Sequence, residues 1–419
     1  MSAAGGAASP PFGRTIARHS LGWLAAANLV GVWLGVSLLW PAAGDLLAPF
    51  TFGRWVPLHL DWQLYGWCAL PLVGALVAWA FDPGHPAAEH HAAAAFGAWS
   101  LALLLGGAGW LGGVVSGKLF LDWQGWTRPL LPAAMHILWA LLAAHTGWRW
   151  RRLSVLQRSL RALLLAGLLI VPTALYWAAD RGGFPPVNPD SGGATGASLL
   201  GSTLGLVTIY LLLPALLGLA APRRGGWLAV ALAVSWLAFV AVDRGHASHH
   251  DGAQIVALGV LLLWIPLWPL GWGAFGWPAE TRPWRHAAAG WWAVLVLSGW
   301  LTFLPGLSER LKFTHALVAH AHLAMAGLVT SVNAVVLVTL TGRPAPRGVF
   351  AAWQAGCALF VGAMLVVGWN EAEQAAELYR GEGAAQVGFI LRLAGGLAMT
   401  AASVRWLLDA WSGRKGGTR

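Results

Sequence analysis

Long apolar runs constrain the fold of this 419-residue chain more than any other feature of its sequence. Each run has about 20 residues, the length that an α-helix needs to cross about 30 Å of hydrocarbon. A helix is expected for every run because it satisfies its own backbone hydrogen bonds in lipid. We count twelve such segments, at 18–42, 54–80, 93–115, 129–148, 160–179, 196–220, 226–243, 253–275, 286–305, 314–340, 349–370 and 386–411.

The sparse charge supports a membrane protein. Only 10% of the residues are charged, whereas soluble domains carry roughly a quarter. A soluble globule, a disordered chain, a secreted disulfide scaffold and a nucleic-acid binder are therefore excluded. The predicted fold is all-α and polytopic, with one twelve-helix membrane domain at 18–411 between a tail at 1–17 and a basic tail at 412–419. Membrane lipid is its expected surrounding, and the N-terminus does not have the pattern of a cleaved signal peptide.

The basic residues predict the orientation. If the N-terminus is cytoplasmic, 17 of the 26 lysines and arginines fall on the cytoplasmic side and nine fall outside. Positive residues favour the cytoplasmic side. We therefore expect a multi-pass protein of a bacterial inner membrane with both termini in the cytoplasm.

The chain has 14 histidines, and an ionisable side chain within a span is a functional hypothesis by default. Five lie at predicted cytoplasmic ends and are expected to be solvated: His19, His85, His90, His91 and His286. His145 alone is expected toward the inner side of a span. The others gather toward the outer ends: His59, His136, His246, His249, His250, His315, His320 and His322.

The most specific local pattern is FTHALVAHAHLAMAG at 313–327. His320 and His322 are two residues apart, so on a helix they point roughly 200° apart. They are poorly placed to bind one metal, but each could hold a separate ligand on opposite faces of one helix. A helix between two haems requires this arrangement, and His59 could then complete a bis-histidine site. The alternative is a pair of core histidines with ordinary hydrogen bonds.

Several segments together resemble subunit I of the haem-copper oxidase superfamily, in particular the C-type (cbb) oxidases and the related nitric oxide reductases. WVPLHLDWQLYGW (55–67) resembles the family's second helix, with its histidine after Pro-Leu. AHAHLAMAG (319–327) resembles its tenth helix, with the His-x-His pair. LLWIPLW (262–268), LTFLPG (301–306) and RLAGGLAM (392–399) resemble its eighth, ninth and last helices.

The resemblance implies one or two haem b groups. His59 and His322 would be the axial ligands of a low-spin haem, and His320 the proximal ligand of a high-spin haem. A c-type cytochrome or another redox subunit is the implied partner, and a quinone is an alternative. The cations expected near the haem propionates are Arg54, Arg310, Lys312 and Arg392.

The chain departs from that family at the copper site. Copper there needs three histidines, one of them from the sixth helix, but no histidine occurs between His145 and His246. Ala194 or a neighbouring glycine takes that place, Leu304 replaces an acid, and no cross-linking tyrosine is found near Ala241. A copper site is therefore doubtful.

A second metal site is conceivable in GHASHHDGAQ. His246, His249 and His250 would share one face of a helix at spacings of three and four residues. The alternative, which we favour, is a polar surface turn at the membrane interface.

Three functions follow. The first is a haem b electron-transfer protein on the oxidase scaffold without a complete copper site. The second is an oxygen or nitric oxide reductase with a reorganised metal site at His246, His249 and His250. The third is a haemless transporter or structural subunit. Oxidoreductase activity is left open, and no catalytic residue is assigned.

Overall fold

The computed structural model describes residues 10–184, 187–220, 226–242, 247–380 and 383–412. Across these residues the chain is helical and has no strand; Val187 and Ala194 form one isolated antiparallel bridge. Ten helical segments are long and apolar enough to cross a membrane. The prediction of an all-α polytopic membrane protein is confirmed at this level.

Each of the twelve predicted apolar segments lies on a helix. Ten coincide with the membrane-length helical segments, and the other two lie on α8 (Gly226–Ala241) and α10 (Arg282–Leu301). The first helix begins at Gly13, inside the predicted tail at 1–17, and the last ends at Ser412. The basic residues of the C-terminal tail lie outside the described residues.

The chain divides into two compact units, Met1–Phe184 with Val336–Val349 and Thr400–Arg419, and Pro185–Val335 with Phe350–Met399. The single membrane domain at 18–411 stays a prediction. The helices α13 (Thr330–Thr341) and α16 (Gly383–Ser412) contribute residues to both units.

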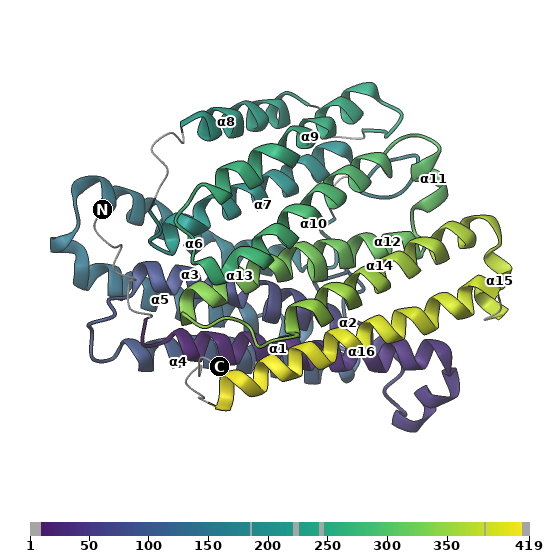
Figure 1. The fold of residues 1–419 in the computed structure, drawn as a ribbon, viewed down its shortest axis with the longest axis horizontal. Helices are drawn as coiled ribbons and strands as arrows, with labels where there is room; N and C mark the ends of the chain where they lie inside the picture. The colour runs from purple at the N-terminus through teal and green to yellow at the C-terminus, as the bar shows by residue number, and fades with distance from the viewer. Residues whose placement is uncertain (1–9, 185–186, 221–225, 243–246, 381–382, 413–419) are drawn as a thin grey trace. The chain divides into compact units, whose positions relative to one another are not determined.

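In the first unit, α1 packs against the helices of the second predicted span. It also contacts α4, which contacts α5, and α5 in turn contacts α6 (Figure 1). The helices of this unit are α1 (Gly13–Leu39), α2 (Phe52–Asp61), the π-helix η2 (Trp62–Cys68), α3 (Leu70–Ala80), α4 (Ala88–Leu111), α5 (Leu130–Arg149) and α6 (Val155–Ala178), with short 3-10 turns η1 (Pro41–Leu47), η3 (Gly125–Thr127) and η4 (Trp150–Arg152).

Arg149 and Arg161, two of the 17 basic residues that the predicted orientation places on the cytoplasmic side, bond to the backbone at the end of α3. Arg161 donates to the carbonyl of Trp79 at 2.7 Å, and Arg149 donates to the carbonyl of Phe81 at 3.2 Å. The last carbonyls of a helix have no partner within it and carry partial negative charge. The same residues that predict the orientation therefore also satisfy the backbone at a helix terminus.

In the second unit, α9 lies between α7 and α10 and also contacts α8 (Figure 1). The α10 helix contacts the segment that begins with α12 and continues as a π-helix. The helices of this unit include α7 (Gly196–Leu216), α8, α9 (Gly252–Gly273), α10, α11 (Leu307–Leu311), α12 (His315–His322), the π-helix η6 (Leu323–Val329), α14 (Val349–Glu373) and α15 (Ala375–Arg380), and a 3-10 turn η5 (Ala279–Thr281) precedes α10.

Tryptophans fill much of the core by packing on one another. In the second unit, the ring of Trp268 lies 5.1 Å from that of Trp272 and 5.5 Å from that of Trp292. In the first unit, Trp110 and Trp123 meet edge-on at 4.9 Å. Aromatic pairs at such separations stabilise a core beyond the area that they bury. Many of the 29 tryptophans therefore serve as core packing.

One glycine allows α14 to approach α12. A Cβ atom at Gly368 would overlap the backbone of Ala316, whereas a Cβ atom at Gly362 in the same helix would meet nothing within 4 Å. We expect Gly368→Ala to destabilise the protein by about 1–3 kcal/mol through overpacking.

Gly362→Ala is the matched control, and it should be neutral or slightly stabilising because alanine favours a helix. Thermal unfolding of both variants in detergent measures the difference. Equal melting temperatures for the two variants would contradict the close approach.

Candidate functional site

Each of the two histidines predicted as low-spin haem ligands lies just before a π-helix. His59 is two residues from the end of α2, and η2 follows directly as Trp62–Cys68. His322 ends α12, and η6 follows as Leu323–Val329. Short π-helical segments are rare and occur frequently at functional sites. Nothing in the sequence predicts them, and they distinguish these two spans.

The His59 ring is oriented by the backbone of α1. Its Nδ1 donates to the carbonyl of Ala27 at 2.8 Å. Because a carbonyl oxygen only accepts, the neutral ring must carry its proton on Nδ1 and its lone pair on Nε2. Gly31 makes room for the ring, since a Cβ atom there would lie 2.7 Å from His59 Cε1. His59 is therefore in the tautomer in which Nε2 carries the lone pair.

His322 has the same kind of support within the second unit. Its Nδ1 donates to the carbonyl of Val318 at 2.8 Å, and its ring stacks on Phe360 of α14 at 4.1 Å between centroids. Hydrogen bonds of this type set the tautomer and orientation of metal-binding histidines. His59 and His322 belong to different units, so their pairing stays a prediction.

His320 points to a different neighbour from His322. Its Nδ1 lies 3.4 Å from Ser298 Oγ, and its Cε1 would lie 3.1 Å from a Cβ atom at Gly299; both residues belong to α10. The ring of His322 instead stacks on Phe360 of α14. The two rings therefore face different helices, in agreement with their two-residue spacing.

A cavity of about 450 Å³ lies beside His320. This volume falls within the range of roughly 300–1,000 Å³ that is usual for ligand pockets. Among the described residues that line it, His320 is the one histidine and Lys312 the one cation. The wall is otherwise largely apolar and includes Leu199, Leu258, Leu261, Leu295, Val296 and Trp300.

Lys312 reaches the cavity past Gly193. Its Nζ donates to Ser191 Oγ at 2.6 Å, and a Cβ atom at Gly193 would overlap the lysine side chain. Burial lowers the pKa of Lys312 from its usual value. Of the four cations predicted to meet propionates, Lys312 is the one that lines this cavity.

The other three predicted cations have protein partners. Arg54 donates to the carbonyl of Leu111 at 3.1 Å, in the first unit. Arg310 pairs with Glu373 and lies over the ring of Trp369. Arg392 lies 5.4 Å from the centre of the Phe360 ring, the same ring on which His322 stacks. Their role toward propionates stays a prediction.

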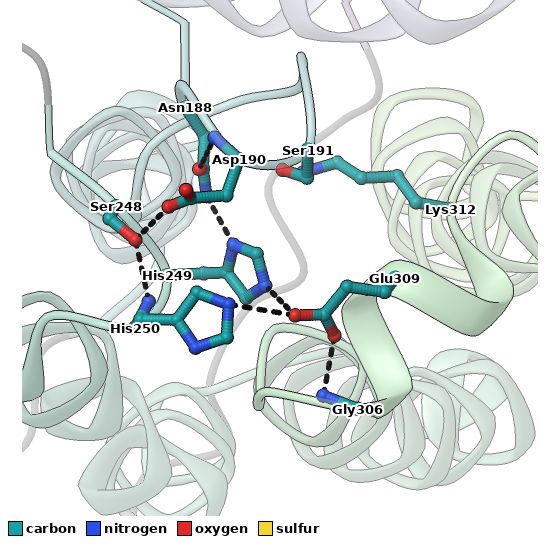
Figure 2. A network of polar contacts seen from close by, with 9 residues as sticks. All are labelled: Asn188, Asp190, Ser191, Ser248, His249, His250, Gly306, Glu309 and Lys312. Atoms are coloured by element: carbon teal, nitrogen blue, oxygen red, sulfur yellow. Dashed lines mark hydrogen bonds and ion pairs between the residues drawn. The ribbon is translucent and has the colours of Figure 1, made fainter.

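His249 and His250 form a polar network with a carboxylate that the sequence interpretation missed (Figure 2). His249 Nε2 lies 2.7 Å and His250 Nε2 lies 2.9 Å from the same oxygen of Glu309. On its other side, His249 Nδ1 lies 2.9 Å from the amide nitrogen of Asn188. Asp190 contacts Ser248 and lies near both imidazoles.

The network corrects part of the expected geometry. His249 and His250 lie in a turn before α9, where Asp251 caps the helix, so they do not share a helix face. His249 is fully buried, and His250 is exposed. His246 lies outside the described residues. Glu309 was missed because it is 59 residues from His250, and no local pattern joins them.

His249, His250 and Glu309 do not line the cavity. The ring of His249 lies 6.3 Å from the ring of Phe303, and Phe303 does line the cavity. Ala194 also lines it; Ala194 or a neighbouring glycine is the residue that the resemblance aligns with the missing copper ligand. The wall that the structure describes thus offers one imidazole to a bound group.

Asp61 is an acid within the second predicted apolar segment, and it is fully buried in α2. Neither of its carboxylate oxygens has a hydrogen-bond partner among the described residues. Such a group is expensive within a membrane. It lies two residues from His59, in the span that the resemblance assigns to haem ligation.

The structure corrects the expectation that His85 and His91 are solvated. His85 and His91 lie together with buried His145 in the first unit, with one nitrogen of each ring within 4.8 Å of the others. Their proximity results from the packing of α4 on α5. Because His145 is far from His85 and His91 in the sequence, no local pattern predicts that the three histidines meet.

No protein-family model matches the chain, and no curated protein matches it. The resemblance to the haem-copper oxidases therefore rests on the motifs and their order.

Acid should remove the stabilisation that Glu309 contributes. Its pKa is lowered from 4.5 to about 2, first by its own backbone N–H and then by His249. A lowered carboxyl pKa stabilises the folded state above the unfolded value, and this contribution is lost as the pH falls through the folded value. The melting temperature of wild type should therefore exceed that of Glu309→Gln above about pH 4.5. The difference should shrink from about pH 4.5 toward pH 2. A difference that does not change with pH would contradict this assignment.

Proposed function

We propose that this chain is a haem b-binding membrane protein that transfers electrons, built as twelve transmembrane helices on a scaffold similar to haem-copper oxidase subunit I. The observation that carries the proposal is the cavity beside His320. It combines one imidazole, one cation and a largely apolar wall in a single pocket. A haem has the complementary chemistry, because its iron takes an axial nitrogen, its propionates are anionic and its ring is apolar.

The side chains fit that group. His320 would hold the iron of a high-spin haem, with Ser298 beside its other ring nitrogen and Gly299 leaving space for the ring. Lys312 would neutralise a propionate at the same pocket. Bound haem supplies one-electron redox chemistry. The protein supplies the ligand, the dry surroundings and the charge that adjust its potential.

A second haem, with His59 and His322 as its ligands, is proposed from the resemblance. Both rings donate Nδ1–H to a backbone carbonyl at 2.8 Å, so both are in the tautomer that bis-histidine ligation requires. Both also precede a π-helix. Because His322 and His320 share α12 and face different helices, this helix would separate the two groups.

The partner is proposed from the same chemistry. A c-type cytochrome or another redox subunit would exchange electrons with the chain, and a quinone is the alternative. With the predicted orientation in a bacterial inner membrane, the ligands lie toward the outer side, where such a cytochrome would approach.

The reductase alternative receives less support. A copper opposite His320 would need three further imidazoles, but the described cavity wall has none beyond His320. His249 and His250 bond to Glu309, and Phe303 lines the cavity in that direction.

Replacing His320 tests the proposal directly. We expect the purified wild-type protein to contain haem b in a pyridine haemochrome assay. His320→Ala should lose the high-spin haem and its carbon monoxide difference spectrum. His315→Ala is the control in the same helix, because His315 contacts Glu371 and does not line the cavity. It should keep the wild-type haem content. A wild-type protein without haem, or a His320→Ala spectrum that matches wild type, would refute the proposal.

Replacing Lys312 tests the propionate contact. A cation near haem favours the reduced form electrostatically, so Lys312→Gln should shift the midpoint potential of the high-spin haem to more negative values. Arg310→Gln serves as the comparison, because the charge of Arg310 is already paired with Glu373. Redox titration of both variants measures the effect. A larger shift in Arg310→Gln than in Lys312→Gln would contradict the assignment.

A further inference from the structure

Three histidines of the first unit meet at a place that the proposed haem sites do not use. His85 comes from the turn between α3 and α4, His91 from the first turn of α4, and His145 from near the end of α5. One ring nitrogen of each lies within 4.8 Å of the other two. His145 is fully buried, and the other two are half-buried.

The separation of two of the nitrogens already matches a metal site. His91 Nδ1 and His145 Nε2 lie 3.1 Å apart. Zinc binds imidazole nitrogens at about 2.0–2.1 Å in tetrahedral geometry, which places neighbouring ligand atoms about 3.3 Å apart. An ion could therefore bind between these two rings with little movement of either.

Aromatic side chains hold the three rings in place. His145 stacks on Phe81 with 3.8 Å between ring centres. The indole of Trp148 stacks on His85 at 4.1 Å, and its centre lies 4.7 Å from that of His145 and 5.7 Å from that of His91. Such contacts restrict ring rotation, so less conformational freedom would be lost when a metal binds.

We propose that His85, His91 and His145 form a binding site for a divalent transition metal of the Zn²⁺ class. Three neutral imidazoles suit zinc and its neighbours, and a water molecule would complete the tetrahedron. The bound ion joins the α3–α4 turn and the start of α4 to the end of α5. This role is structural and independent of haem.

Metal binding replaces weak contacts in the metal-free cluster. The hydrogen bond between His91 and His145 is lost, and the proton moves to another ring nitrogen. The backbone N–H groups of Asp82 and Ala87 contact His145 Nδ1 at 3.4 Å and His85 Nδ1 at 3.2 Å. One or both of these backbone contacts must lengthen slightly when the metal binds. The net contribution of one hydrogen bond is small beside that of a structural zinc ion.

The imidazoles, and not the nearby charges, would hold the cation. The carboxylate of Asp82 lies 3.7 Å from Arg152 and accepts a hydrogen bond from Gly84. Arg149 donates to the carbonyls of Trp79 and Phe81 and keeps its positive charge. One carboxylate and two arginines therefore lie near the cluster, so binding of the ion depends on the three ring nitrogens.

The test uses the full-length protein in detergent after removal of metals with a chelator. Equilibrium dialysis with Zn²⁺ gives the stoichiometry, and Co²⁺ gives a visible absorption band when its site is tetrahedral. We expect His91→Ala and His85→Ala each to bind one equivalent of Zn²⁺ less than wild type and to lose the cobalt band. Zn²⁺ should also raise the melting temperature of wild type but not of His91→Ala.

His90 is the matched control. It is the residue before His91, it is exposed, and it lies outside the three-histidine cluster. His90→Ala should therefore keep the wild-type stoichiometry and cobalt spectrum. Circular dichroism verifies that all variants are folded. The proposal is overturned if His85→Ala and His91→Ala bind as much Zn²⁺ as wild type, or if His90→Ala loses as much as they do.

Discussion

The backbone polar groups inside a bilayer must find partners within the protein, and this constraint organises the chain. Helices satisfy nearly all of the backbone, so the informative places are those where a helix ends or changes its hydrogen bonding. At the end of α3, Arg149 and Arg161 bond to the last carbonyls. After His59 and His322, the backbone switches to a π-helical pattern. The histidines themselves bond to carbonyls of α1 and α12, so backbone groups also determine which nitrogen each ring offers.

The positions of the helices were largely predictable because length and hydropathy suffice to identify helices that cross a membrane. All twelve predicted apolar segments are helical, and the largest differences are at their ends. The two-residue spacing of His320 and His322 also predicted correctly that their rings meet different neighbours. Both successes depend on local geometry, which the sequence encodes directly.

The features that the sequence did not predict depend on contacts between segments that are distant in the sequence. Glu309 joins His249 and His250 across about sixty residues, and His145 joins His85 and His91 across more than fifty. The prediction that His85 and His91 are solvated was wrong because it considered only their position in the chain. The cavity was likewise invisible to the sequence, since its wall is assembled from α7, α9, α10 and α12.

Gly193 shows how a residue without a side chain can set the electrostatics of a pocket. Lys312 occupies the volume where any other residue at this position would place its Cβ atom. The position of the positive charge at the cavity therefore depends on two residues, Lys312, which carries it, and Gly193, which leaves room for the end of the lysine side chain. A methyl group at Gly193 would change the field inside the pocket although no charged residue had been altered.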